Sequence, residues 1–259
     1  ESKENPRIKF IKKLRQKSRF RKQENLFILE GEKLVFEGLS YGNVKEIYVS
    51  GSKKEIIKKT PDSCPYFLVK DSLFSEISDT EEPQGIIGIF SIPRWKEEEF
   101  YLEKGMYLFL DEVRDPGNLG TMIRTAEAMG VKGVVLSKGC ADCYQPKVTR
   151  ATMGSILRVP VLRDRDLQEE GEAFHKRNGK IIAGDLQGNE LDLNELGLRQ
   201  KYKDSSFGVV IGNEAHGISE QTREIVDIRL RLPMEGKVES LNAAITAAIF
   251  LYALKNGKS

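Results

Sequence analysis

The sequence is poor in the residues that build metal sites and disulfides. It contains three cysteines and two histidines in 259 residues. A small and odd number of cysteines is typical of a protein from a reducing compartment, so we expect a cytoplasmic location. Cys140 and Cys143 form a C-x-x-C pair, but zinc needs two further ligands at suitable spacing, and the only histidines are His175 and His216. We therefore expect no bound metal.

Long apolar runs and the common nucleotide-binding motifs are also missing. No run approaches the roughly 20 apolar residues that span a bilayer, and no signal-peptide pattern is present, so we expect no membrane association. Residues 115–120 carry glycines only three positions apart, which excludes the G-x-G-x-x-G fingerprint of dinucleotide sites. The chain also lacks a phosphate-binding G-x-x-x-x-G-K-[ST] loop and a Ser-His-Asp or Cys-His pattern.

Positive charge is concentrated at the start of the chain. Residues 1–25 hold ten Lys or Arg against three Asp or Glu, although the whole chain has a net charge of only +2. The spacing of Ile8, Ile11 and Leu14 predicts a helix over residues 6–24 with one apolar face and basic residues around the rest. A basic arm on a mildly acidic body indicates a polyanionic partner, and the alternative is a solvated surface helix.

Apolar strands alternate with helices along the rest of the chain. Residues 26–90 read as a small α/β layer, and residues 93–105, with Pro93, Trp95 and a charged run, read as a linker. From residue 106 we expect strands at 106–113, 133–137, 158–162, 180–184, 207–212 and 228–232, and helices at 119–129, 145–156, 165–177, 219–226 and 240–255. This alternation predicts an α/β fold with a mostly parallel sheet covered on both faces. The expected domains are residues 1–92 and 106–259.

Three stretches of the second domain repeat the order strand, polar glycine-containing loop, helix. They run from Tyr107 to Met129, from Phe207 to Val226 and from Ile228 to Leu254. A helix start carries unpaired N–H groups and partial positive charge, so a loop folded against it is a natural ligand cradle. Asn118 and Ser240 stand where N-caps of two of these helices are expected.

The three loops carry the resemblance to a known family. Asp115 to Ala126, Val210 to Ile218 and Leu232 to Asn242 resemble, in order and spacing, the three motifs of the SpoU-type RNA ribose methyltransferases. The N-terminal part, with Glu30-Gly31 and Gln84-Gly85, resembles the substrate-binding domain that many members carry. The resemblance implies S-adenosylmethionine as methyl donor and a ribose 2′-hydroxyl as acceptor, in ribosomal RNA more than in tRNA. It also implies a trefoil knot in the C-terminal domain and a homodimer with the active site near the interface.

The resemblance, together with the positive charge of the N-terminal arm, indicates residues for three roles. The catalytic set is Asn118, Arg124, Glu214, Ser240 and Asn242; the cofactor set is Gly184, Ile211, Gly212, Leu232, Met234 and Leu241; the RNA-binding set is Lys12, Lys13, Arg15, Arg19, Arg21 and Arg150. Arg150 is equally well explained as a residue that caps a helix face.

Arg124 lies among Met122, Ile123 and Ala126, and a charge beside such a stripe is costly unless it is paired. We expect it to point into a polar site, with solvent at the helix edge or an ion pair with Glu214 as alternatives. Since an arginine does not give up its proton, its expected role is to hold a phosphate or the developing alkoxide, while Glu214 or water takes the proton.

The last helix predicts a partner surface. Residues 240–255 are apolar over more than the single stripe that a surface helix needs, and a two-fold homodimer is the default symmetry. The alternative is that the N-terminal domain covers this helix in a monomer. For function, the alternatives are a non-catalytic RNA-binding protein and a methyltransferase acting on a base or on another substrate. The joint presence of Asn118, Arg124, Glu214 and Asn242 speaks against the first.

Overall fold

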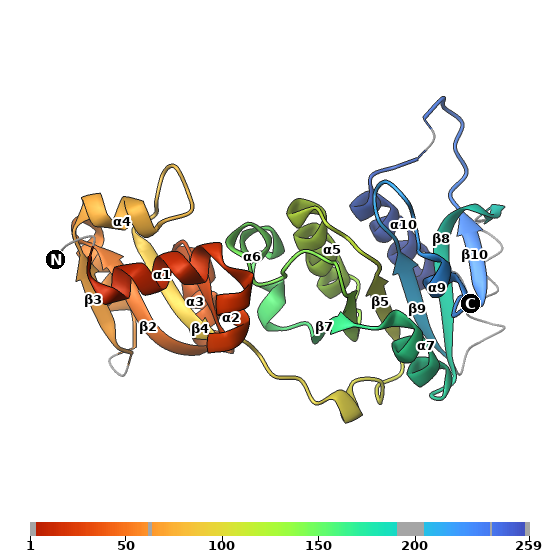
Figure 1. Cartoon of the computed structure of the whole chain (residues 1–259), viewed down its shortest axis with the longest axis horizontal. Coiled ribbons are helices and arrows are strands. Elements are labelled where there is room, and N and C mark those ends of the chain that lie inside the picture. The colour runs from red at the N-terminus through yellow and green to blue at the C-terminus, as the bar shows by residue number, and fades with distance from the viewer. Residues whose placement is uncertain (1–3, 62–63, 191–204, 239, 257–259) are drawn as a thin grey trace. The chain divides into compact units, whose positions relative to one another are not determined.

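The computed structural model describes residues 4–61, 64–190, 205–238 and 240–256, which form two compact units (Figure 1). Unit 1 comprises Glu1–Arg94 together with Asp142–Arg158, and unit 2 comprises Trp95–Ala141 together with Val159–Ser259. The segment Asp142–Arg158, which lies inside the expected second domain, therefore packs with the N-terminal part of the chain.

Unit 1 is a mixed four-stranded sheet with helices on both faces. Its elements are α1 (Pro6–Gln16), α2 (Ser18–Glu24), β1 (Leu26–Glu30), α3 (Glu32–Tyr41), β2 (Asn43–Ser50), the 3-10 helix η1 (Gly51–Lys59), β3 (Tyr66–Val69), α4 (Asp71–Ile77), β4 (Ile86–Ser91), α6 (Pro146–Thr152) and the 3-10 helix η3 (Ser155–Leu157). The strand order is β1-β4-β2-β3. One face of the sheet packs against α1 and α4. α3 and α6 also contact the sheet, both of them at β1.

The single helix expected over residues 6–24 is wrong, because the chain breaks at Lys17 into α1 and α2. Lys17 is extended, with φ −116° and ψ 108°. The break turns Arg21 back toward the end of α1, where its guanidinium donates to the carbonyl oxygens of Leu14 (2.5 Å) and Arg15 (2.9 Å). These are carbonyls that a helix end leaves without a partner. The buried Ile8, Ile11 and Leu14 confirm the predicted apolar face.

Unit 2 is built on a parallel sheet, as the alternating pattern predicts. Its elements are the 3-10 helix η2 (Glu97–Glu99), β5 (Met106–Leu110), α5 (Pro116–Ala128), β6 (Gly133–Ser137), β7 (Val161–Arg165), α7 (Leu167–His175), β8 (Gly179–Glu190), β9 (Ser206–Ile211), α9 (Glu220–Arg223), β10 (Ile228–Arg231) and α10 (Ala243–Asn256). Within the described residues the strand order is β10-β8-β9-β5-β6-β7, and each neighbouring pair is parallel.

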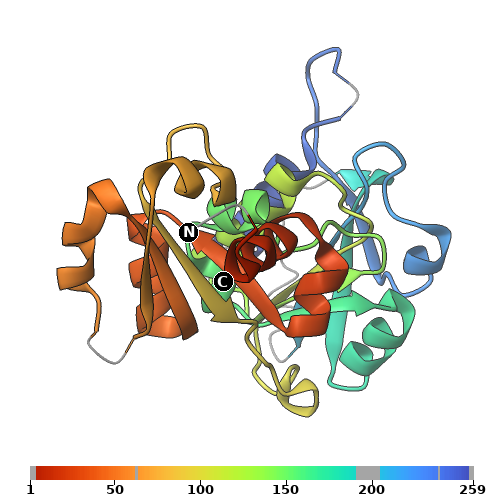
Figure 2. The ribbon, with the colours of Figure 1, turned by 60° about the vertical axis from the view of Figure 1, so that its left-hand side comes forward.

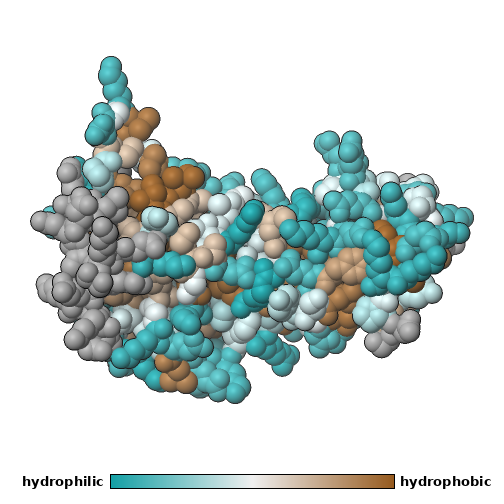
Figure 3. All heavy atoms as spheres, turned by 180° about the vertical axis from the view of Figure 1, so that it is seen from behind, coloured by the Kyte–Doolittle hydropathy of each residue, from teal (hydrophilic) through white to brown (hydrophobic). Residues whose placement is uncertain are grey.

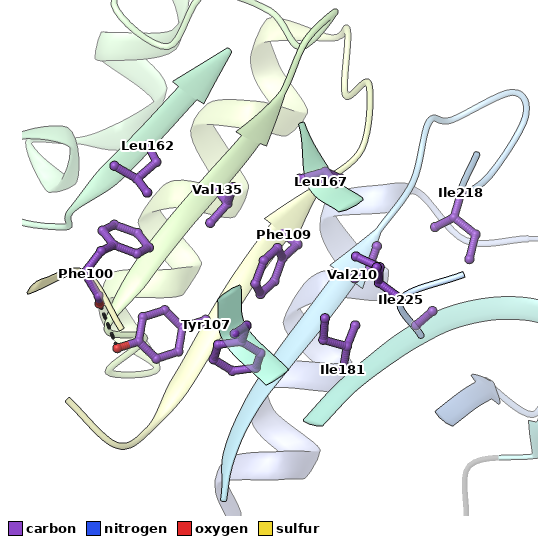
Figure 4. Close-up of a cluster of buried hydrophobic side chains, with 12 residues drawn as sticks. Phe100, Tyr107, Phe109, Val135, Leu162, Leu167, Ile181, Val210, Ile218 and Ile225 are labelled. Atoms are coloured by element: carbon purple, nitrogen blue, oxygen red, sulfur yellow. Dashed lines mark hydrogen bonds between the residues drawn. The ribbon is translucent and has the colours of Figure 1, made fainter. Parts of the chain in front are cut away.

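An aromatic core lies between this sheet and α7 (Figure 4). Phe174 of α7 packs edge-on against Tyr107 and Phe109 of β5, with ring centroids 5.3 and 5.5 Å apart. Such edge-to-face pairs add stability beyond the area they bury. α10 packs against α5 and also contacts β9 and β8. The sheet is therefore held from both sides, and its strand ends are fixed in position.

The strand order places a switch point between β5 and β9. From β5 the chain moves outward through β6 and β7, whereas β9, β8 and β10 occupy the other half of the sheet. In open parallel sheets, ligands bind beyond the carboxyl ends of the strands at such a point. The loops that follow β5, β9 and β10 are therefore the part of the described fold that is able to form a site.

Candidate active site

A cavity of about 570 Å³ opens at the carboxyl ends of β9 and β10, beside Gly184 and Asp185 in the middle of β8. This volume is in the range typical of small-molecule sites. The six residues predicted to hold the cofactor all line it: Gly184, Ile211, Gly212, Leu232, Met234 and Leu241. Glu214, Ser240 and Asn242 of the predicted catalytic set line it as well. The cavity combines apolar side chains on the loop after β10 with backbone and polar groups on the loop after β9.

The loop after β9 is closed tightly by Asn213 and Gly217. Their backbones exchange two hydrogen bonds of 2.9 Å each, and the Asn213 side chain accepts from the Ala215 N–H at 2.9 Å. The Asn213 amide also donates to the carbonyl oxygen of Glu112 (2.9 Å), which ties the loop to the end of β5. A Cβ at Gly212 would lie 2.2 Å from the carbonyl carbon of Gly217, so no larger residue fits there. This geometry presents Glu214 at the surface of the cavity.

A chain of side-chain hydrogen bonds joins the three motif loops. The Asn118 amide donates to Oε1 of Glu214 at 2.9 Å, and the Asn242 amide donates to Oδ1 of Asn118 at 2.9 Å. These residues come from the start of α5, the loop after β9 and the start of α10. Residues separated by 96 and 124 positions along the chain are thus in direct contact. The structure brings together three of the five predicted catalytic residues.

The residues that cap α5 and α10 differ from the expected ones. This difference explains why the Asn118 side chain is available for the hydrogen bonds that join the three loops. Asp115, not Asn118, caps α5, because its carboxylate accepts from the Asn118 backbone N–H at 2.7 Å. Asn242, not Ser240, caps α10, because its Oδ1 accepts from the N–H of Ala244 at 2.9 Å. The Asn118 side chain is thereby left to bridge Glu214 and Asn242. Ser240 is exposed at the cavity.

Arg124 is not part of this contact network. It is exposed on α5, while Met122, Ile123 and Ala126 on the same helix are buried. Within the described residues it forms no ion pair with Glu214, and it does not line the cavity. The guanidinium therefore faces solvent at the helix edge and not the polar site that we expected, and the alternative ion pair with Glu214 is not formed within the described residues. Its side chain is thus accessible to a ligand.

The predicted RNA-binding residues divide into paired and exposed groups. Lys12 pairs with Glu76 at 2.6 Å, and Arg150 pairs with Asp79 at 2.8 Å. Arg15 donates to the carbonyl oxygen of Glu76 at 3.1 Å. Lys13 and Arg19 are exposed on α1 and α2.

Arg21 does not fit the RNA-binding prediction, because only 3% of its side chain is exposed. Its guanidinium lies 2.7 Å from the carboxylate of Asp142. Burial by itself raises the pKa of Asp142, but the charge of Arg21 and hydrogen bonds outweigh burial and hold the pKa below its usual value. Arg21 is therefore a structural residue that joins α1, α2 and the segment before α6.

Two supporting residues of the site were missed by the sequence interpretation. Asp115 precedes Pro116 at the first position of α5, and an Asp-Pro start is a recognisable N-cap signal. Asp111, at the end of β5, accepts from the backbone N–H of Ser219 at 2.8 Å and anchors the far side of the β9 loop. Its pairing spans 108 residues and has no local signal in the sequence.

Among the residues that the structure describes, no group of three or more His, Cys, Asp or Glu side chains is arranged to hold a metal ion. The Cys140 thiol donates to the carbonyl oxygen of Leu110 at 3.2 Å, and burial raises its pKa, which disfavours the reactive thiolate. None of the described helices has the length and apolar character needed to cross a bilayer.

Comparisons with known proteins identify the family of the chain. Residues 105–252 match the model of the SpoU rRNA Methylase family, and residues 5–88 match that of the MRM3-like substrate binding domain. The chain is 36% identical over 256 residues to the 23S rRNA (guanosine(2553)-2′-O)-methyltransferase of Bacillus subtilis, covering 98% of both chains.

Solved structures give the same result. The AdoMet-bound rRNA methyltransferase of Sinorhizobium meliloti superposes with a TM-score of 0.85 at 30% identity, over 98% of this chain and 95% of that one. A putative TrmH-family RNA methyltransferase of Porphyromonas gingivalis superposes with a TM-score of 0.82 at 31% identity, over 95% and 96% of the two chains. The chain therefore belongs to the SpoU rRNA methylase family.

Proposed function

We propose that the protein transfers a methyl group from S-adenosylmethionine to a ribose 2′-hydroxyl of ribosomal RNA. The observation that carries this proposal is the contact of Asn118, Glu214 and Asn242 beside a ligand-sized cavity at the switch point of the sheet. The relative in Bacillus subtilis, which matches over nearly the full length of both chains, is named as an rRNA 2′-O-methyltransferase. A vestigial pocket would not need to keep these three side chains in contact.

The cavity fits a donor of this kind. Its loops offer the half-buried side chains of Leu232 and Met234 and the exposed Leu241 as apolar surface for a flat base. The lack of a side chain at Gly212 lets the backbone of Gly217 and Ile218 pack closely against it, and the backbone of this loop lines the cavity. We propose that these residues, with Gly184 and Ile211, hold the adenosine part. When bound, S-adenosylmethionine supplies a methyl group on a positively charged sulfur, which a weak nucleophile is able to attack.

The catalytic residues would act mainly by position and charge. We propose that Arg124 holds a phosphate of the RNA or the developing negative charge on the ribose oxygen, because its guanidinium is exposed and positively charged. Asn118 and Asn242 fix the direction of the Glu214 carboxylate through their hydrogen bonds. Glu214, or a water molecule held by it, accepts the proton of the hydroxyl group, and Ser240 orients the ribose.

Two measurements test the proposed function. Calorimetry should detect binding of S-adenosylmethionine to the purified full chain. Ribosomal RNA from a strain that lacks the gene, incubated with the protein and the methyl donor, should yield one 2′-O-methylated nucleoside after digestion and mass spectrometry. A methylated base would favour the alternative in which the enzyme modifies a base. Methylation of tRNA but not of ribosomal RNA would make tRNA the substrate. If S-adenosylmethionine does not bind, a non-catalytic RNA-binding protein is favoured.

We propose that residues 1–92 bind the RNA and that residues 106–259 carry the methyltransferase. Because Lys12, Arg15, Arg21 and Arg150 have partners within the protein, the RNA contact of the basic arm would fall on the exposed Lys13, Lys17 and Arg19. Removing α1 as a whole is a poor test of this contact, because it would also remove the buried Ile8, Ile11 and Leu14.

Changing Lys13, Lys17 and Arg19 together to glutamine should therefore weaken RNA binding and flatten its salt dependence. Each phosphate contact contributes about 0.7 to 0.9 to the slope of log K against log salt, so losing three contacts should lower the slope by about two to three. A matched variant that changes the exposed Lys138, Lys176 and Arg177 of unit 2 is the control. An unchanged slope in the first variant would show that the arm does not contact RNA.

We also propose that the protein is a homodimer formed through α10. Ile245 and Tyr252 of α10 are 51% and 60% exposed, and their spacing places them on one side of the helix with the half-buried Ile249. The loop between β10 and α10 projects from its unit (Figure 2), and hydrophobic atoms gather beside it (Figure 3). A two-fold partner would cover this stripe.

Replacing Ile245 with glutamate should convert the dimer to a monomer, because the interface would have to bury an unpaired charge. Light scattering at micromolar concentration should show a mass near 29.3 kDa for the variant and twice that mass for the wild type. The control is Leu102→Glu, which changes another exposed leucine of unit 2, 55% exposed, outside α10. A monomeric wild type would end this proposal.

We also propose that the C-terminal part of the chain forms a trefoil knot and that the protein is cytoplasmic. The knot is supported by membership of the family and by the packing of α10 against α5 and β9. The three free cysteines, Cys64, Cys140 and Cys143, support a reducing compartment.

A further inference from the structure

Unit 1 contains a second cavity, of about 420 Å³, at the strand ends where β2 begins and β4 finishes. Ser91, the last residue of β4, lies between Leu26 of β1 and Asn43 of β2 in the strand register. Asn25 and Tyr41 line the cavity beside them. The cavity thus lies at the opposite ends of these strands from the Gly31 and Gly85 turns, and every residue lining it belongs to unit 1.

Several polar side chains of this cavity have no hydrogen-bond partner within the described residues. They are the side chains of Asn25, Asn43, Ser91 and Arg94 and the hydroxyl group of Tyr41. Asn25 is fixed by its backbone, which has φ 54° and accepts from the Ile92 N–H at 3.0 Å. Convergent polar groups that the fold does not use are a mark of a binding site.

Tyr41 adds a flat surface that is held in place from one side. The guanidinium of Arg158 lies 5.2 Å from the centre of its ring, within the range of a cation–π contact. Glu37, one turn before Tyr41 on α3, forms an ion pair with Arg158 and fixes its direction. The Tyr41 side chain nevertheless remains 62% exposed, so much of the ring is open to a ligand.

These features fit one kind of ligand. The open tyrosine face suits a flat ring, and the amides of Asn25 and Asn43 each offer a donor and an acceptor to the edge of a base. Arg94 supplies positive charge for a phosphate, and no acidic side chain is among the residues that line the cavity. The volume is in the range for a ligand as small as one nucleotide.

We propose that this cavity binds one unpaired nucleotide of the RNA substrate, whose base stacks on Tyr41 and meets Asn25 and Asn43 at its edge. The inference rests on the proposed function only for the identity of the RNA as substrate. Unit 1 would then recognise single-stranded RNA through a base as well as through charge. A base inside a regular duplex cannot enter, because its faces are covered by its neighbours and its edge is paired.

The test compares three variants of the full chain: Tyr41→Ala, Tyr41→Phe and, as control, Tyr66→Ala. Tyr66 is also an exposed tyrosine of unit 1, 49% exposed, but lies on β3 outside the cavity. The probes are a fluorescein-labelled single-stranded RNA 12-mer of mixed sequence and the same strand in a fully paired duplex. Affinities are measured by fluorescence anisotropy, and thermal melting confirms that each variant is folded.

Tyr41→Ala should weaken binding of the single strand about tenfold, the size expected when one stacked base loses its aromatic partner. Tyr41→Phe and Tyr66→Ala should stay within about twofold of the wild type, because the first keeps the ring and the second leaves the cavity intact. Binding of the duplex should not depend on Tyr41. Equal affinity of Tyr41→Ala and the wild type for the single strand, or an equal loss in Tyr66→Ala, would overturn the inference.

The assay also separates this inference from the proposed function. If the wild type methylates ribosomal RNA but Tyr41→Ala binds the single strand normally, only the nucleotide site is refuted. If the wild type binds no S-adenosylmethionine and methylates no RNA, the proposed function fails, while a loss of single-strand binding in Tyr41→Ala would still support the site.

Discussion

Replacing Arg124 with alanine should lower the rate of methyl transfer by about 10²- to 10³-fold, the loss typical of removing one group that stabilises transition-state charge. The affinity for S-adenosylmethionine should stay unchanged, because Arg124 does not line the cavity. The melting temperature should also stay unchanged, because the side chain is exposed and has no ion pair within the described residues. Single-turnover kinetics with saturating RNA and donor measure the effect on the chemical step.

Arg124→Lys distinguishes a point charge from a planar contact. Lysine keeps the charge but not the forked geometry that binds two oxygens of a phosphate, so its activity should also be poor. The control is Arg177→Ala, which removes an exposed arginine elsewhere in unit 2. Near-normal turnover in Arg124→Ala would remove this residue from the catalytic set and leave Asn118 and Glu214 as the principal candidates.

Replacing Arg21 with alanine should destabilise the protein by about 3 to 5 kcal/mol, the cost of leaving one partner of a buried ion pair alone. Only 3% of the Arg21 side chain and 9% of the Asp142 side chain are exposed, so water cannot replace the lost partner. The variant also loses two hydrogen bonds to the end of α1. Urea unfolding of the wild type, the variant and the control Arg19→Ala measures the effect. The exposed Arg19 should change stability by less than about 0.5 kcal/mol.

The stability difference should depend on pH in a definite direction. In the wild type the pKa of Asp142 is held below its usual value, so the pairing stabilises the fold above the unfolded pKa and is lost as the pH falls through the folded value. Without Arg21, burial is opposed only by the hydrogen bonds from Ser18 and Tyr144, so the pKa of Asp142 rises and protonation relieves part of the penalty. The difference between wild type and Arg21→Ala should therefore shrink between about pH 7 and pH 4. A constant difference would mean that packing, not charge, makes Arg21 important.

The sequence predicts the sheet of unit 2 and the position of its site because both depend on patterns that are local. Each strand is a short apolar run, and each functional loop directly follows one of these runs. Once the strands are parallel, their carboxyl ends lie at one edge of the sheet. Gly212 and Leu232 directly follow two of these strands, so the strand pattern alone predicts that they line one cavity together with Gly184 of β8.

The contacts that the sequence did not predict depend on a choice between neighbouring groups. Asp115 and Asn118 are both good caps for α5, as Ser240 and Asn242 are for α10, and local preference does not decide between them. The choice is made by Glu214, which comes from another loop and takes the Asn118 amide. In the same way, Asp142 lies 121 residues from Arg21, and no periodic pattern shows that a basic side chain will turn inward to meet it.

The hydrogen-bond chain through Asn242 and Asn118 has a single direction, since each donor points toward Glu214. One end begins at the N–H of Ala244, next to the loop that carries Leu241, and the other ends on a carboxylate facing the cavity. A donor molecule that settles against Leu241 and shifts Asn242 therefore changes the hydrogen bonding of Glu214. Thermodynamic linkage then requires that RNA contacting Glu214 and a cofactor contacting Leu241 alter each other's affinity by the same factor. Occupancy of either ligand would thus report on the other, although the two need not touch.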